Sequence, residues 1–491
     1  MDTKPAEGRI LTANIRGPVS FTRDDDGRLT ARRGGGGVVS ALSSAFGTGD
    51  TLWICAALND ADRAWAGSTP GGRLGLDGSP GGSKVRMLDI PPATFQRAHN
   101  GVANSTLWFV HHMLYETPMQ PQFGLAFEPE WEAFRAYNRA FAEALAADAG
   151  PSADGGPAIR AVVQDYHLSL VPRMVADLRP DIRIAHFTHT PWAPPDYYRM
   201  LPRPARDQIL EGVLGADHAG FHCQQWADAF LDCCEVILGA DVDRARRRVS
   251  YRDHETSVGV HPLGVDAAEL KLRGAQPDVQ ARMATLAKAA RGRKLIVRVD
   301  RTELSKNIIR GLAAYRELLV RYPEWRGRVS HLVFAYPSRQ DLPLYREYMA
   351  GVTRMAHEIS DEFGANGWEP VTLEVDDDYA RSLAAYRLAD VLLVNPLRDG
   401  MNLVAKEGMI LSDDGCALVL SSEAGAAAEL EADALMVNPY DVSETAQALH
   451  QALSMDDDER RRRTASLARA AAAHPPARWF AGQLAALDRE A

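Results

Sequence analysis

The sequence predicts an α/β protein built from two doubly wound, parallel sheets. Short continuous apolar runs recur along the chain, and each is followed by a polar loop and an amphipathic helix. Apolar strands that alternate with helices are typical of parallel sheets covered on both faces. The length of 491 residues exceeds what one hydrophobic core usually supports, so we expect two domains.

The strand and helix pattern appears in both halves of the chain. In the first half, "AIRAVVQDYHLSLVPRMVADL" predicts a strand that ends before Asp165, and "IRIAHFTHTPW" predicts another that ends near His189. In the second half, "KLIVRVDRTELSKNIIRGLAAYRELLVRYP" predicts a strand and then a helix, because apolar residues recur at helical spacing from Ile308 to Tyr322. "HLVFAYPSRQD" and "ADVLLVNPLRDG" repeat the plan. Ligands bind beyond the carboxyl ends of such strands, where the polar loops fall.

The domain boundary is expected within residues 258–277, where a strand gives way to polar sequence that contains glycine and proline. We therefore predict an N-terminal domain over residues 1–265 and a C-terminal domain over residues 266–475. A last helix, residues 476–491, is predicted to pack back on the first domain.

Composition excludes some classes of partner. The chain has 55 basic and 65 acidic residues and a net charge of −10, which argues against a general nucleic-acid-binding surface. It lacks an N-terminal secretory signal and any apolar run near the ~20 residues that span a bilayer. Its five cysteines form no zinc-like CxxC pairs. We therefore expect a cytoplasmic protein with reduced cysteines and no membrane partner. The sequence is compatible with a homo-oligomer.

The stretch "RDGMNLVAKEG" places ionisable groups directly after the apolar run "VLLVNPL". If a helix begins at Gly400, the backbone amides of residues 400–403 favour an anion such as a diphosphate. Glu407 lies eight residues beyond Asp399, roughly 12 Å along a helix axis. Asp399 could then bind sugar hydroxyls and Glu407 a ribose diol. The alternative is an N-capping aspartate and a surface glutamate.

Three further motifs indicate a polar ligand. "RTELSK" carries Arg301 and Lys306, two cations that can neutralise a diphosphate, although an exposed basic loop explains them equally well. The glycine run of residues 34–37 lets backbone approach a phosphate or sugar, or forms a flexible turn. Asp165, His167 and His189 at strand ends favour a polar pocket. HExxH and GxSxG motifs are absent, so hydrolases of those types have no support.

Taken together, these motifs resemble the trehalose-6-phosphate synthase family of retaining glycosyltransferases. The matching segments follow the family's order over nearly the whole chain: "RGPVSF", "LWF", "QDYHL", "HTPW", "RTELSKN", "PSRQD", "PLRDGMNLVAKE" and "VNPYD". The resemblance implies the GT-B fold, with two Rossmann-like domains facing across a cleft and a C-terminal helix returning to the N-terminal domain. It implies that the N-terminal domain binds the acceptor and the C-terminal domain the nucleotide sugar.

The resemblance also implies roles for individual residues. Catalytic roles fall on His189, Arg301, Lys306 and Asp399. Further donor-binding roles fall on Gly36, Gly37, Met401, Asn402, Leu403 and Glu407. Acceptor-binding roles fall on Arg16, Trp53, His99, Trp108, Asp165 and Arg339, with Trp53 lining the pocket. No metal or other cofactor is implied.

The implied reaction moves glucose from UDP- or GDP-glucose to glucose-6-phosphate and forms α,α-trehalose-6-phosphate. Its partners are a nucleotide diphosphate sugar and a sugar phosphate. The alternatives are a pseudo-glycosyltransferase that couples a nucleotide-activated cyclitol to an aminocyclitol phosphate, or transfer to another phosphorylated acceptor. A silent regulatory protein is disfavoured because the donor residues are kept together.

The chain departs from the family at three places. A histidine, His99, stands where the family commonly has a tyrosine, the middle of "RTELSKN" differs, and "ANIRGP" carries an extra residue. Both cations of "RTELSKN" remain, so these departures affect the acceptor more than the donor.

Overall fold

The computed structural model describes residues 9–33, 39, 42, 51–75, 84–151 and 159–488. The chain forms two compact units: Met1–Pro262 together with Pro476–Ala491, and Leu263–Pro475. Gly36 and Gly37, which were predicted to approach the donor, lie outside the described residues.

The first unit contains a ten-stranded sheet that is parallel through its centre. The parallel strands, in spatial order, are β6 (Lys84–Leu88), β4 (Thr51–Ala56), β1 (Ile10–Ala13), β7 (Arg160–Gln164), β8 (Arg183–Thr188), β9 (His218–Phe221) and β12 (His254–Val260). Antiparallel strands extend both edges: β5 (Arg73–Gly75), β11 (Arg248–Tyr251) and β10 (Asp241–Asp243). A separate hairpin joins β2 (Val19–Arg23) to β3 (Leu29–Arg33).

The helices of the first unit connect these strands. They are α2 (Asp60–Ser68), α3 (Pro92–Gln96), α4 (Trp108–His111), α5 (Phe127–Asp148), α6 (Val171–Leu178), α7 (Pro195–Tyr198), α8 (Arg203–Val213) and α9 (Gln224–Cys233). A π-helix, Arg97–Leu107, lies between α3 and α4.

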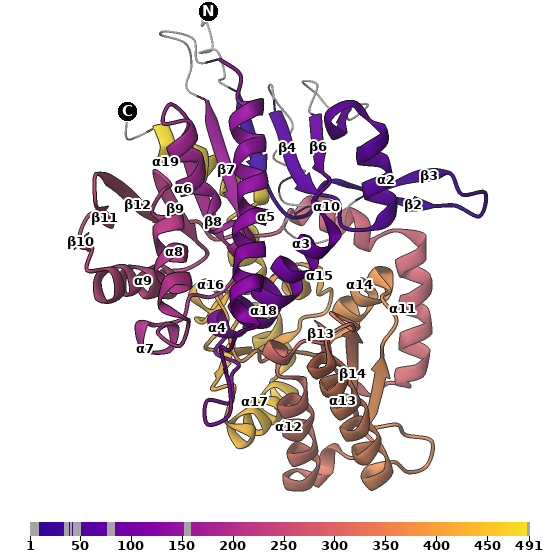
Figure 1. Cartoon of the computed structure of the whole chain (residues 1–491). Helices are drawn as coiled ribbons and strands as arrows, with labels where there is room; N and C mark the ends of the chain where they lie inside the picture. Colours follow the sequence, from indigo (N-terminus) through magenta and orange to yellow (C-terminus); the bar gives the residue numbers. More distant parts are fainter. Residues whose placement is uncertain are drawn as a thin grey trace, which may run out of the picture. The chain divides into compact units, whose positions relative to one another are not determined.

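The predicted C-terminal helix is confirmed as α19 (Pro476–Asp488), and it returns to the first unit. A proline suits the first turn because the amide it lacks would have no helical partner there. The helix contacts β7, β8 and β9 (Figure 1, yellow) and buries Trp479, Phe480 and Leu487. The end of the chain is therefore part of the same core as the strands that lead to Asp165 and His189.

The second unit contains a six-stranded, fully parallel sheet. Its spatial order is β15 (Val371–Glu374), β14 (Val329–Tyr336), β13 (Lys294–Arg301), β16 (Val391–Val394), β17 (Ala417–Ser421) and β18 (Leu435–Val437). Numbered along the chain, this order is 3-2-1-4-5-6, so the direction of winding reverses between β13 and β16. In such sheets a ligand binds beyond the strand ends at the reversal.

Helices cover both faces of this sheet. They are α10 (Ala267–Gly274), α11 (Pro277–Ala290), α12 (Ile308–Arg321), α13 (Pro343–Phe363), α14 (Tyr379–Leu388), α15 (Leu403–Leu411), α16 (Ala427–Leu430), α17 (Val442–Ser454) and α18 (Asp457–Ala472). In the part of the chain that the structure describes, no helix is both long and apolar enough to cross a membrane.

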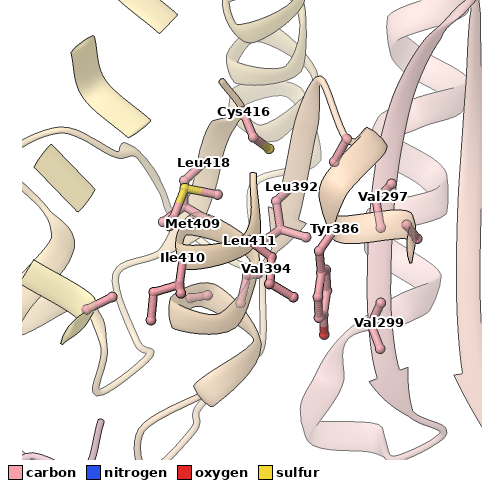
Figure 2. Packing of buried hydrophobic residues seen from close by; sticks show 14 of the residues in the cluster. Val297, Val299, Tyr386, Leu392, Val394, Met409, Ile410, Leu411, Cys416 and Leu418 are labelled. Carbon is pink, nitrogen blue, oxygen red and sulfur yellow. The ribbon is translucent and has the colours of Figure 1, made fainter. Parts of the chain in front are cut away.

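Alternate residues of the central strands enter two different cores. Val297 and Val299 of β13 pack with α14 and α15 on one face, whereas Ile296 packs with α12 and α17 on the other. Figure 2 shows the first core, with Tyr386 of α14 on the side of Val297 and Val299 and Met409 of α15 beside Leu418 of β17. Successive side chains of a strand point to opposite faces, so a strand buried on both faces is a continuous apolar run. The predicted parallel sheet with two covered faces is confirmed in this unit.

Candidate functional site

The loops after β13 and β16 meet at the reversal of the second sheet through an ion pair. Lys306 Nζ donates to Asp399 Oδ2 at 2.5 Å, and Asn402 Nδ2 donates to the same oxygen at 3.1 Å. The side chains of Lys306 and Asp399 are only 15% and 16% exposed. Burial lowers the pKa of Lys306, but the carboxylates of Asp399 and Asp300 raise it above its ordinary value. The site therefore holds a fixed, charged ammonium group beside a carboxylate.

The buried guanidinium group of Arg298 holds the backbone of Lys306 in place. Arg298 is fully buried, and it donates to Asn395 Oδ1 and to the backbone carbonyl of Lys306. Its Nε lies 2.9 Å from Asp300 Oδ2. A Cβ at Gly311 would overlap Arg298 Nη1, so a larger residue there would displace the guanidinium group. The position of Lys306 is thus set by a polar network that packing alone does not predict.

The helix that follows β16 begins later than predicted. Helix α15 starts at Leu403, and Asn402, at φ 74°, is its N-cap. Asn402 Oδ1 accepts from the amide of Ala405 at 3.2 Å. The prediction that the helix begins at Gly400 is therefore wrong, and the N-cap is an asparagine rather than an aspartate. Only the amide of Leu403, among those of residues 400–403, belongs to the first helical turn.

The residues before α15 pair with another loop instead of forming a helical turn. The amide of Asp399 donates to the Glu423 carbonyl at 3.1 Å, and the Gly425 amide donates to the Asp399 carbonyl at 3.0 Å. A Cβ at Gly425 would overlap the carbonyl of Gly400. This close pairing keeps the chain non-helical up to Asn402 and fixes the backbone of Asp399 at the carboxyl end of the sheet.

Glu407 is partly buried on α15, near the hydroxyl of Tyr386. Burial raises the pKa of Glu407 to about 7, although the hydrogen bond with Tyr386 lowers it. Because the helix starts at Leu403, the predicted helical separation from Asp399 does not apply. Helical rise covers only the last four steps, roughly 6 Å. Glu407 is a titratable group near neutrality on the helix that starts beside Asp399.

Glu303 is a site residue to which the sequence reasoning assigned no role. It is fully buried, and its Oε1 lies 2.9 Å from Arg301 Nη1 and accepts from Ser338 Oγ at 2.8 Å. Burial raises the pKa of Glu303, but Arg301, Arg339 and Lys306 bring it down to about 2. The signal was present in "RTELSK", where an acid stands between two cations. Glu303 therefore holds a permanent negative charge between the predicted phosphate-binding arginines.

The other basic groups of "RDGMNLVAKEG" brace the fold. Lys406 is fully buried, donates to the Leu263 carbonyl at 2.9 Å and pairs with Glu429 at 2.6 Å. Arg398 Nε lies 3.1 Å from Glu423 Oε2. These two cations hold neighbouring loops together, so the ionisable residues of this segment divide into site groups and supporting groups.

In the first unit, Asp165 and His189 follow the adjacent strands β7 and β8. Asp165 Oδ1 accepts from the backbone amides of Tyr166 at 2.9 Å and His189 at 3.3 Å, and its Oδ2 lies 3.5 Å from His167 Nδ1. Burial raises the pKa of Asp165, but His167, His189 and the Tyr166 amide hold it well below its ordinary value. Burial lowers the pKa of His189 to about 4. At neutral pH the site therefore presents a carboxylate and a neutral imidazole.

His99 lies beside this pair on the π-helix. Its ring stacks on Phe95 and His167, with centroids 5.1 and 5.4 Å apart. His167 in turn faces Asp165. The structure brings His99 to the neighbourhood of Asp165, and its predicted contact with the acceptor stays a prediction.

The other residues predicted to bind the acceptor differ in their surroundings. Arg16 is exposed on the loop after β1, and Trp108 stacks on His112 with centroids 3.9 Å apart. Trp53 was expected to line the pocket, but it is only 1% exposed and donates from Nε1 to the Arg16 carbonyl at 3.1 Å. Trp53 is buried because it lies in a central strand, and it supports the Arg16 loop; its predicted place in the acceptor pocket stays a prediction. Arg339 belongs to the second unit and donates to the Tyr345 hydroxyl at 2.6 Å.

Among the described residues, no group of three or more His, Cys, Asp or Glu side chains is arranged to hold a metal ion. In the second unit, the charges of Arg301, Lys306 and Arg339 all act on the buried carboxylate of Glu303.

Known proteins share the sequence family of this chain. The model of glycosyltransferase family 20 matches residues 10–489. The chain is 33% identical to the UDP-forming alpha,alpha-trehalose-phosphate synthase of Schizosaccharomyces pombe, over 91% of this chain and 84% of that one. It is 34% identical to the trehalose-6-phosphate synthase of Mycobacterium sp. (strain JLS), over 97% and 95%.

Solved structures extend the likeness to the fold. An Escherichia coli protein of this kind, bound with UDP-2-fluoro glucose, matches with a TM-score of 0.84 and 26% identity, over 98% of this chain and 99% of that one. A Burkholderia xenovorans synthase in complex with glucose-6-phosphate matches with a TM-score of 0.82 and 25% identity, over 98% and 100%. The GT-B assignment is confirmed, and the chain belongs to glycosyltransferase family 20.

Proposed function

We propose that this protein transfers glucose from a nucleotide diphosphate glucose to glucose-6-phosphate, with retention of configuration, and forms α,α-trehalose-6-phosphate. The family match and the named relatives support the reaction. The observation that carries the proposal is the meeting of Lys306 and Asp399 at the reversal of the second sheet. A doubly wound sheet binds its ligand at that position, and a nucleotide sugar needs both a cation and a hydroxyl acceptor there.

The donor's diphosphate is proposed to bind Lys306 and Arg301. Lys306 keeps its charge in a largely enclosed position, and Arg301 is held at 2.9 Å by Glu303 while its side chain remains 55% exposed. Fixed cations aimed at a leaving group stabilise the charge that develops there without reorganisation in the transition state. Asp399 would then accept hydrogen bonds from sugar hydroxyls.

Glu407 is proposed to bind the ribose of the donor. An ionised carboxyl group accepts hydrogen bonds at both of its oxygens, whereas a protonated one carries a hydrogen on one oxygen and binds two hydroxyl donors less well. In the protein without nucleotide, burial raises the pKa of Glu407 to about 7, so ionising it costs free energy. Ribose hydroxyls would add hydrogen-bond donors to the one that Tyr386 supplies and would lower the pKa of Glu407 again. Ionised Glu407 is thus more stable with a diol bound than in the unliganded protein.

The proposed chemistry needs no enzyme nucleophile. The acceptor hydroxyl attacks the anomeric carbon on the face from which the nucleotide leaves, and the departing phosphate oxygen accepts the hydroxyl proton. His189, neutral at physiological pH, would contact the donor sugar, and Asp165, which stays ionised, would accept a hydrogen bond from the acceptor. Arg301 and Lys306 would stabilise the leaving diphosphate.

Glu303 is proposed to position the two phosphate-binding arginines. Its charge faces Arg301 directly and acts on Arg339, which the family resemblance assigns to the acceptor phosphate. A carboxylate near two anionic ligands repels both of them. We therefore attribute the presence of Glu303 to its contacts with the arginines. Ordering Arg301 and Arg339 before the ligands arrive would lower the entropy cost of binding.

The reaction is tested by offering UDP-glucose and GDP-glucose with glucose-6-phosphate, glycerol phosphate or an aminocyclitol phosphate. We expect nucleotide release that requires glucose-6-phosphate, and a product whose NMR signals show two anomeric carbons, both in the α configuration. The Lys306→Ala variant should lose roughly 10²–10³-fold in kcat, the scale of one lost stabilising donor. Lys288→Ala, an exposed lysine on α11, is the matched control and should keep its activity. Equal activity in both variants would refute the role of Lys306, and release with another acceptor alone would refute the assigned substrate.

The Glu407→Gln variant should be more stable than the wild type at high pH and should bind the nucleotide more weakly. The raised pKa means that the folded protein holds a proton more tightly than the unfolded chain between pH 4.5 and about 7. The ionised group therefore destabilises the fold as pH rises through this window, and the cost is fully present above pH 7. We expect Glu407→Gln to raise Tm at pH 8, with little change at pH 4.5, and to weaken UDP binding measured by calorimetry at pH 8. The exposed Glu431→Gln should change neither quantity; the same Tm shift at both pH values would contradict the account.

Glu303→Gln should weaken the binding of both substrates, although it removes a negative charge near two anions. If Glu303 positions the arginines, KM for donor and acceptor should each rise about ten-fold or more, because hydrogen bonds to charged groups are lost. Glu303→Asp keeps the charge and should lose less than Glu303→Gln. Tighter binding of both substrates to Glu303→Gln would instead show that Glu303 acts only as a repelling charge.

A further inference from the structure

A chain of side-chain hydrogen bonds links the C-terminal helix to His189. On α19, Gln483 Nε2 donates to the Trp479 carbonyl at 3.4 Å. Gln164, the last residue of β7, donates from Nε2 to Gln483 Oε1 at 3.2 Å. Gln164 Oε1 lies 2.8 Å from His189 Nε2. Gln164 and Gln483 are 0% and 1% exposed, so water does not compete for these contacts.

The direction of each bond follows from the one before it. Because Gln483 gives its amide hydrogen to a backbone carbonyl, its oxygen faces Gln164. Because Gln164 gives its amide hydrogen to that oxygen, its own oxygen faces His189. An amide oxygen only accepts, so His189 Nε2 must carry the hydrogen. In a neutral ring, Nδ1 then has a lone pair and is an acceptor.

The surroundings hold the ring and leave part of it accessible. The rings of Phe187, His222 and Trp479 pack around His189, with centroids 4.8, 5.1 and 5.5 Å from it. The titratable groups that face it are the carboxylate of Asp165, which the backbone amide of His189 contacts, and the imidazoles of His186 and His222. His189 itself is partly exposed. A ligand can therefore reach a ring whose orientation is already fixed.

We propose that the C-terminal helix fixes His189 as the Nε2–H tautomer through Gln483 and Gln164, so that His189 Nδ1 accepts a hydrogen bond from a hydroxyl of the donor sugar. Gln164 and Gln483 are positioning residues and do not touch the substrate. The contact with the sugar rests on the proposed function, whereas the tautomer does not. The opposite tautomer would place two lone pairs, of Nε2 and Gln164 Oε1, against each other. The return of the last helix to the first unit thus has a role in recognition as well as in packing.

The tautomer is tested by ¹⁵N NMR of the histidine rings in the full-length protein, with His189→Gln assigning the signals. In the wild type at pH 7.5 we expect a protonated Nε2 and an unprotonated Nδ1. Gln483→Leu should produce a mixture of tautomers and lower kcat/KM for the nucleotide sugar about ten-fold, the effect of one hydrogen bond. A wild-type ring protonated at Nδ1 would overturn the proposal, whatever the activity of the protein.

Two further variants separate positioning from packing. Gln164→Glu places a carboxylate beside His189 and raises the pKa of the ring, since an opposite charge favours the imidazolium. The imidazolium has no acceptor at Nδ1, so the acid limb of the kcat/KM profile should move up by about one pH unit or more. Leu487→Ala removes a buried apolar contact of α19 one helical turn after Gln483 and leaves the hydrogen bonds of Gln483 and Gln164 in place; it should lower Tm and leave the ring signals and the pH profile unchanged. If Gln483→Leu behaves like Leu487→Ala in all three measurements, α19 acts only by packing and the proposal fails.

Discussion

The ion pair between Lys306 and Asp399 is the contact on which the second unit's site depends. It joins the loops that leave β13 and β16, the two strands between which the sheet reverses its winding. Each partner is held from its other side: Lys306 through its carbonyl by the buried Arg298, and Asp399 through its backbone by the loop at residues 423–425. Neither group can move far, so the pair presents one cation and one carboxylate at a fixed spacing. A ligand with an anionic and a hydroxylated part matches that arrangement.

Several charged groups around the two sites are more costly to the unliganded fold than neutral groups would be. Burial raises the pKa of Glu407. Glu303 is buried and Asp165 is mostly buried, and both stay ionised because neighbouring groups lower the pKa of each. Buried ionised groups are weak evidence of stability, because desolvation offsets their attraction. They are better explained by what they orient or bind. In this protein Glu303 contacts Arg301 and Asp165 contacts His167 and the His189 backbone, and the proposed role of Glu407 is to accept hydrogen bonds from ribose hydroxyls.

The sequence predicted the strands, and it indicated candidate site residues, because both leave local signals. Continuous apolar runs marked β13 and β16, and helical spacing marked α12, where Ile308 and Tyr315 are fully buried. The start of α15 was misplaced because it depends on a positive φ at Asn402 and on pairing with a distant loop. The burial of Trp53 likewise depends on where its strand lies within the sheet. The hydrogen bond between Gln164 and Gln483 joins residues 319 positions apart, so no local sequence pattern predicts it.

The central claim is that Lys306 and Asp399 bind the nucleotide sugar as a unit, and a double-mutant cycle on UDP-glucose affinity tests it most directly. Calorimetry would compare the wild type with Lys306→Ala, Asp399→Asn and the double variant, each first checked for a native circular dichroism spectrum. We expect both single variants to bind more weakly and the double variant to lose less than their sum, by about 1 kcal/mol or more, as for residues in contact. Unchanged affinity in both single variants would contradict the claim, and strictly additive losses would show that the two residues do not act as a unit.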